Sequence, residues 1–153
     1  MEAGLLEVCL TRRLAAPPAM VFAAWIDREQ LAKWWGPKCF TNRVYQVDAR
    51  VGGAMLIDMQ SPEGVVYPMT GRFVTIDRPH RLVFVTAAID EQGKPMFEVM
   101  NTVTFTEARG GTEISLVARV IKTTSAAAPK HLAGMSEGWC QSLDRLSELV
   151  VLV

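Results

Sequence analysis

Asn101 is the polar side chain whose position in the sequence points most directly to a binding role. In the stretch F-E-V-M-N-T-V-T-F, alternate residues share one face of a predicted strand: Phe97, Val99, Asn101, Val103 and Phe105. An unpaired buried amide costs roughly 1–3 kcal/mol, so Asn101 needs a partner on that face. The partner is either a neighbouring backbone group, as in a satisfied core amide, or a water or ligand.

Arg12 raises the same question at the start of the chain. Leu5 to Leu14 alternates as a strand, and Arg12 falls on the apolar face formed by Leu6, Val8 and Leu10. A guanidinium there must be paired, reach the sheet edge, or face a wet cavity. A strand end or a bulge at this point would remove the need for any partner.

Two adjacent tryptophans, Trp34 and Trp35, precede Gly36-Pro37, which ends a predicted short helix that Asp27 can cap. Neighbouring helical residues point about 100° apart, so the two indoles cannot face the same way. We expect one to anchor the helix in the core and the other to lie at the edge of a cavity.

The sequence offers no recognisable catalytic or metal-binding constellation. His80 and His131 lack a partner at ligand spacing, and no G-x-S-x-G, Walker or G-x-G-x-x-G pattern occurs. Cys9, Cys39 and Cys140 match neither a zinc spacing nor a disulfide framework. We therefore expect no cofactor, no metal, no catalytic residue and reduced thiols.

The composition narrows the class of partner. The 153 residues fit one domain, residues 1–153, and lysine plus arginine balance aspartate plus glutamate at 16 each. A nucleic-acid-binding chain usually shows a basic excess, so we expect no nucleic-acid partner. The start M-E-A-G-L-L-E resembles no secretory signal, and no apolar run is long enough to span a bilayer. We expect a cytoplasmic protein that does not enter a membrane.

The periodicity predicts an α+β domain. A first strand is followed by two short helices, then by a run of antiparallel strands that begins with 43–51 and a tight turn at Gly52-Gly53. Tyr45, Met55 and Met59 fall on the predicted inner faces. The last element is a long amphipathic helix, so the fold is expected to be a curved antiparallel sheet wrapped around that helix.

The predicted last helix runs from about Lys130 to Val150. Its apolar stripe is formed by Leu132, Met135, Trp139, Leu143, Leu146 and Val150. Gly134 and Gly138 border the stripe, and a helix-interior glycine costs roughly 1 kcal/mol relative to alanine. Either the close approach of a strand or room for a ligand should offset that cost, and we expect close packing.

Several short motifs occur in a consistent order along nearly all of the chain. They are Ala16-Pro17, Val21-Phe22, Leu31 with Trp34-Trp35-Gly36-Pro37, Val51-Gly52-Gly53, Gly71, Pro79 with Leu82-Val83, Gly110-Gly111-Thr112, and Gly138-Trp139 with Leu143 and Leu146. In this order they resemble the START-like, or SRPBCC, superfamily with its helix-grip fold. The chain is most similar to the branch related to the C-terminal domain of the heat-shock-protein-90 ATPase activator.

This resemblance implies a cavity between sheet and last helix, and hence a module that binds an apolar or amphipathic small molecule. The residues expected to bind that ligand are Trp34, Trp35, Tyr45, Met55, Met59, Phe97, Asn101, Met135, Trp139 and, as a weaker candidate, Arg12. A co-chaperone-like interaction domain and a cyclase- or hydrolase-type enzyme are the alternatives.

Apolar residues on the outer strand faces, such as Met100 and Val117, also predict a homodimer.

Overall fold

The computed structural model describes residues 7–123 and 134–151 of the chain. One strand, two short helices, six further strands and a long helix follow one another along the sequence. Their bounds are β1 (Glu7–Leu14), α1 (Pro18–Ile26), α2 (Arg28–Trp34), β2 (Thr41–Val47), β3 (Ala54–Gln60), β4 (Val66–Asp77), β5 (Arg81–Ile89), β6 (Pro95–Ala108), β7 (Gly111–Thr123) and α4 (Met135–Val151).

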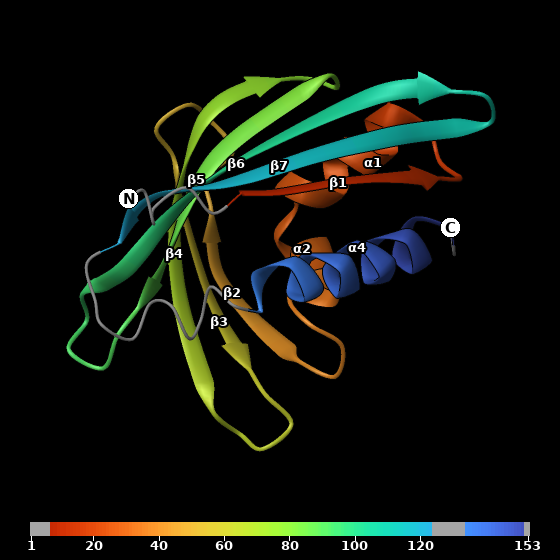
Figure 1. Ribbon diagram of the computed structural model, residues 1–153. Helices are drawn as coiled ribbons and strands as arrows, with labels where there is room; N and C mark the ends of the chain where they lie inside the picture. Colours follow the sequence, from red (N-terminus) through yellow and green to blue (C-terminus); the bar gives the residue numbers. More distant parts are fainter. Residues whose placement is uncertain (1–6, 124–133, 152–153) are drawn as a thin grey trace.

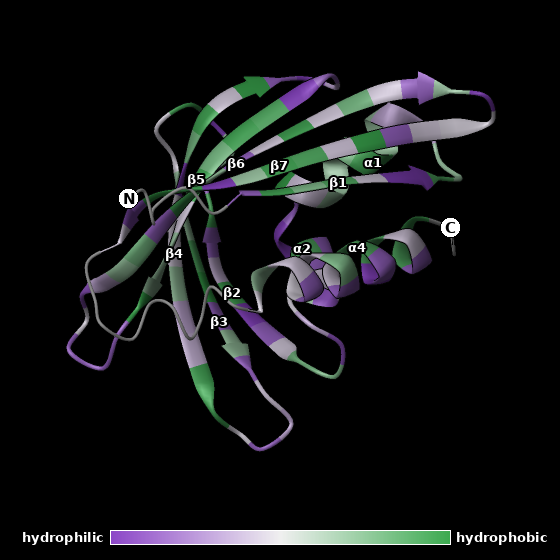
Figure 2. Cartoon of the chain, viewed as in Figure 1, coloured by the Kyte–Doolittle hydropathy of each residue, from purple (hydrophilic) through white to green (hydrophobic). Residues whose placement is uncertain are grey.

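The seven strands form one sheet in the order β1-β7-β6-β5-β4-β3-β2, and every neighbouring pair is antiparallel. Figure 1 shows this sheet bent, with α1, α2 and α4 on its concave side. Alternation of hydrophobic and hydrophilic residues along β6 and β7 is visible in Figure 2. The predicted α+β helix-grip architecture is therefore confirmed.

Each short helix begins at a residue suited to that position, and α2 lies between Asp27 and Gly36 as the sequence predicts. α1 begins at Pro18, where a missing N–H costs nothing, and buries Val21, Phe22 and Trp25. Asp27 caps α2, because its Oδ2 accepts a hydrogen bond of 3.0 Å from the Gln30 backbone N–H.

The end of α2 turns the two indoles apart. Trp34 is fully buried, and its Nε1 donates to the Ala24 carbonyl at 2.9 Å, which ties α2 to α1. Trp35 is the residue that ends the helix, and Gly36 then takes a left-handed φ of 89° that favours glycine. The chain thus makes a sharp corner directly after the tryptophan pair.

Arg145 of α4 holds this corner. Its guanidinium donates to four backbone carbonyls, those of Lys33 at 2.8 Å, Trp35 at 2.9 Å, Gly36 at 3.2 Å and Pro37 at 2.9 Å. A cation at the end of a helix is favoured, since the last carbonyls lack intrahelical partners and carry partial negative charge. Burial lowers the pKa of the guanidinium, with the nearby Cys39 and Glu148 acting in the opposite direction.

The apolar stripe predicted for the long helix is the side of α4 that is buried, as far as the described residues extend. Leu143, Leu146 and Val150 are buried against the sheet, and Trp139 is partly buried beside them. The described helix begins at Met135, and predicted residues 130–133 lie outside the described part of the chain.

The prediction for the strand at 43–51 was wrong in register and in length. β2 ends at Val47, the loop to β3 spans residues 48–53 rather than two glycines, and the pairing slips between Val44 and Gln46. Because of this bulge, Val44 is the buried residue, and Tyr45 is 50% exposed on the opposite face. The Tyr45 hydroxyl donates to Asp58 Oδ2 at 3.0 Å.

Replacing Arg145 should show how much the corner depends on it. We expect Arg145→Leu to lower the free energy of unfolding by about 2 kcal/mol, because four carbonyls lose their donor. Arg145→Lys should restore only part of this, since an ammonium lacks the planar fork. Urea denaturation measures the free energy of unfolding of both variants.

Arg13→Leu, which removes an exposed arginine 3.9 Å from Glu113, is the control and should change stability by about 0.5 kcal/mol or less. An equal effect of the two leucine variants would contradict this role.

Candidate functional site

A cavity of about 570 Å³ lies between the inner face of the sheet and the first turns of α4. Its wall is built from the corner after α2, from β3 to β6, and from the helix. The lining residues are Trp35, Gly36, Pro37, Phe40, Met59, Tyr67, Pro68, Met69, Thr86, Ala88, Ile89, Met96, Phe97, Val99, Asn101, Gly134, Met135, Gly138, Trp139 and Ser142.

The described residues of this wall are mostly apolar, and none of them has a charged side chain. Its polar side chains are the uncharged Tyr67, Thr86, Asn101 and Ser142. An ionised group inside the cavity would lose its hydration and meet no opposite charge from the lining residues. The cavity therefore suits an uncharged, mostly apolar occupant.

Six of the ten residues predicted to bind a ligand come together in this wall. Trp35 stands at the corner and packs against Trp139 of the helix, with ring centroids 5.4 Å apart. The other four are Met59 on β3, Phe97 and Asn101 on β6, and Met135 on α4.

The structure places the remaining four elsewhere. Trp34 and Met55 are buried in the core, and Tyr45 lies on the outer face because of the bulge described above. Arg12 is half-buried on β1, whereas the cavity lies over β3 to β6. β1 pairs with β7 without a bulge from Glu7 to Leu14, so Arg12 does point to the inner face, and its Nη1 donates to the Thr11 carbonyl at 3.0 Å.

Sequence reasoning missed the contribution of β5. Phe84, Thr86 and Ala88 alternate on its inner face, and the side chains become smaller toward the end of the strand. A strand whose inward side chains become smaller along its length indicates empty space beside its end. The order of Phe84, Thr86 and Ala88 in the sequence already contained this signal. The missed Ser142 lies on α4, one turn beyond Gly138.

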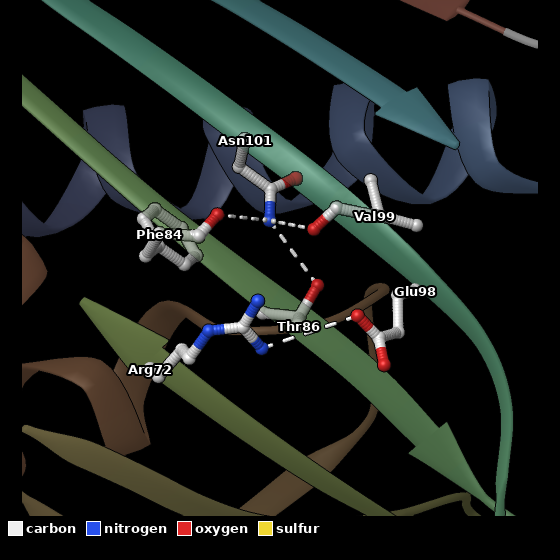
Figure 3. Close-up of polar contacts among 6 residues, drawn as sticks. All are labelled: Arg72, Phe84, Thr86, Glu98, Val99 and Asn101. Carbon is white, nitrogen blue, oxygen red and sulfur yellow. Dashed lines mark hydrogen bonds and ion pairs between the residues drawn. The ribbon is translucent and has the colours of Figure 1, made fainter. Parts of the chain in front are cut away.

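Asn101 is fully buried, and its amide nitrogen is tied to the sheet (Figure 3). Nδ2 lies 3.2 Å from the Phe84 carbonyl, 3.3 Å from the Val99 carbonyl and 3.1 Å from Thr86 Oγ1. Oδ1 points away from these three acceptors, and no donor of the described residues bonds to it. The NH₂ group of Asn101 is therefore hydrogen-bonded as in a core amide, whereas its oxygen has no partner among the described residues.

Close packing does not explain Gly138 of α4 or Gly134 directly before it, so that expectation was wrong. A Cβ built on Gly134 or Gly138 would meet no atom of the described residues within 4 Å beyond the immediate chain and helix backbone. Both glycines line the cavity. A side chain at either position would extend into that space.

Within residues 7–123 and 134–151, no group of three or more histidine, cysteine, aspartate or glutamate side chains is placed to hold a metal ion. In the same ranges, no helix is both long and apolar enough to cross a membrane.

Comparison with known proteins adds the evolutionary context. Residues 15–151 match the family described as activator of Hsp90 ATPase homolog 1-like protein. No curated protein matches the chain.

Several solved structures share the fold. A crystallised protein from Chromobacterium violaceum is 30% identical, with 94% of this chain and 96% of that chain covered and a TM-score of 0.80. The AHSA1 protein from Silicibacter pomeroyi is 24% identical, with 96% and 99% covered and a TM-score of 0.80. A protein from Arthrobacter aurescens, solved by NMR, is 24% identical, with 97% and 87% covered and a TM-score of 0.85.

The family match spans nearly the whole described fold, from the end of β1 to the end of α4. The chain therefore belongs to the family of proteins like activator of Hsp90 ATPase homolog 1, within the SRPBCC superfamily.

Proposed function

We propose that this protein is a binding module for an uncharged, largely apolar small molecule held between the sheet and α4. The observation that carries the proposal is the cavity of about 570 Å³, in whose wall no described residue has a charged side chain. Small-molecule sites are typically apolar pockets of roughly 300–1,000 Å³ with a few polar groups that orient the ligand. Both the size and the lining fit that description.

Gly138 supports the proposal independently. It lies inside α4, where alanine would be favoured by roughly 1 kcal/mol. The space beside it would accept a methyl group without a clash with the described residues. Stability alone therefore does not account for glycine here, whereas preserving room for a ligand does.

An enzymatic role is less well supported by the wall. Among its residues only Tyr67 has an ionisable side chain, and Tyr67 is 37% exposed at the rim. General acid–base chemistry needs groups that exchange protons near neutral pH. Within residues 7–123 and 134–151, the lining supplies no histidine, carboxylate, lysine or cysteine for that purpose.

A protein-interaction role is the second candidate. The family description names an activator of the Hsp90 ATPase. Two valines and a tyrosine, Val65, Val66 and Tyr67, are exposed together where β3 turns into β4. This tip offers an apolar contact for a protein partner such as a chaperone. The homodimer expected from Met100 and Val117 stays a prediction.

N-phenyl-1-naphthylamine, an uncharged fluorescent probe, tests the small-molecule proposal. We expect saturable binding of one molecule per chain, and about tenfold weaker binding by Ala88→Trp, which fills the cavity from β5. Val74→Trp adds the same side chain at an exposed position of β4 outside the wall, and it should bind like the wild type. Titration of probe emission measures all three.

The 8-sulfonate of the same dye tests the requirement for an uncharged ligand. Its anionic group has no counter-charge in the wall, so we expect about tenfold weaker binding than for the parent dye. Equal affinity for the two dyes would contradict an uncharged ligand. Equal affinity of wild type and Ala88→Trp for the parent dye would reject the cavity as the site.

Gly138→Ala should move stability and binding in opposite directions. We expect the free energy of unfolding to rise by about 0.5–1 kcal/mol, because alanine favours the helix. The affinity for N-phenyl-1-naphthylamine should fall about fivefold, because the methyl group takes up cavity space.

Ser147→Ala is the control for helix propensity, since Ser147 lies on the same helix outside the wall. It should leave the affinity unchanged. Chemical denaturation and probe titration give the two quantities for each variant. A Gly138→Ala protein that is more stable and binds as tightly as wild type would show that glycine does not preserve ligand space.

A further inference from the structure

We propose that the ligand of this cavity carries a neutral hydrogen-bond donor, a hydroxyl or an N–H group, that is accepted by Asn101 Oδ1. The inference rests on the proposed function, because it specifies the chemistry of the molecule that the cavity binds. It starts from a fully buried side chain in the cavity wall whose acceptor has no partner among the described residues.

The contacts of Asn101 determine whether its amide nitrogen or its amide oxygen is the atom without a hydrogen-bond partner. Nδ2 faces the carbonyl oxygens of Phe84 and Val99, at 3.2 and 3.3 Å. A carbonyl can only accept, so the group beside these two oxygens must be the NH₂ group. Turning the amide over would set oxygen against oxygen. The orientation is thus fixed, and the free group is an acceptor.

A buried acceptor without a partner is costly, and it gains more from a donor than an acceptor already in contact with water. A ligand with a hydroxyl or N–H group would satisfy it. A ligand with only an ether or ketone oxygen would instead bring a second acceptor to the same place. Oδ1 therefore selects between molecules of similar shape and apolarity.

The donor must also be uncharged. An ammonium group would need a carboxylate partner when it loses water, and the wall contains none. Neutral alcohols, phenols, amides and indole-like N–H groups remain. The polar group of such a molecule would lie against β6, with its apolar body in the rest of the cavity.

A donor reaches Oδ1 through a side-chain movement in the wall, because the oxygen has almost no accessible area in the structure. Met135 and Trp139 line the cavity from the helix and are only partly buried. Methionine is unbranched and changes rotamer at little cost. Among the helix residues of the wall, Met135 is therefore the one whose side chain moves most easily.

Two matched probes test the inference: 1-octanol, which has a donor, and 1-methoxyoctane, which has only an acceptor. Calorimetry gives the ratio of their affinities in the wild type, in Asn101→Leu and in Thr102→Val. Differences in the hydration of the probes cancel when the ratio is compared between variants.

We expect the preference for the alcohol to be about fivefold larger in the wild type than in Asn101→Leu. Thr102→Val removes a hydroxyl from the next position of β6, outside the cavity wall, so it should keep the wild-type preference. The same preference in all three proteins would overturn the inference.

A measurement on the wild type avoids any effect of the leucine variant on folding. With labelled asparagine, the side-chain carbonyl carbon of Asn101 should shift downfield on binding 1-octanol, because its oxygen gains a hydrogen bond. Binding of 1-methoxyoctane should leave that resonance in place. If both probes bind and neither shifts it, the inference fails while the proposed function stands. If neither these probes nor N-phenyl-1-naphthylamine binds, the proposed function itself fails.

Discussion

The architecture depends on a mismatch of widths. Seven strands spaced about 4.8 Å apart make a sheet roughly 30 Å wide, whereas a helix with its side chains is about 10–12 Å across. The long helix packs chiefly against β1, α1 and α2, so its start leaves part of the sheet from β3 to β6 without a close partner. The cavity is the part of the concave face that the helices leave uncovered.

Polar contacts at the corner after α2 keep this space from closing. Arg145 fixes α4 to four carbonyls of α2 and the corner, and Asn42 Nδ2 donates to the Ala32 and Trp35 carbonyls at 3.1 and 2.6 Å. These directional bonds set how near the helix comes to the sheet. Apolar packing has no such preference and would favour a smaller gap. The later turns of α4, with Leu143 and Leu146, then bury their side chains fully.

Much of the fold could be predicted because local patterns and tertiary packing agree. The Asp27 cap and the stripe with Leu143 and Leu146 needed only spacing and residue type. The face of Tyr45 could not be predicted, since a bulge is decided by pairing with β3 and leaves no mark on the alternation. For Gly138, the sequence allowed both close packing and empty space, and only the surrounding atoms decide between them.

The tryptophans have a consequence for how the molecule absorbs and emits light. All four indoles of the chain belong to one connected cluster, with centroids 4.6 Å apart for Trp25 and Trp34, 5.6 Å for Trp34 and Trp35, 5.4 Å for Trp35 and Trp139, and 5.9 Å for Trp25 and Trp139. At such separations excitation passes between rings faster than it is emitted. The tryptophan fluorescence of the protein thus reports on a single place, the junction of α1, α2 and α4 beside the cavity.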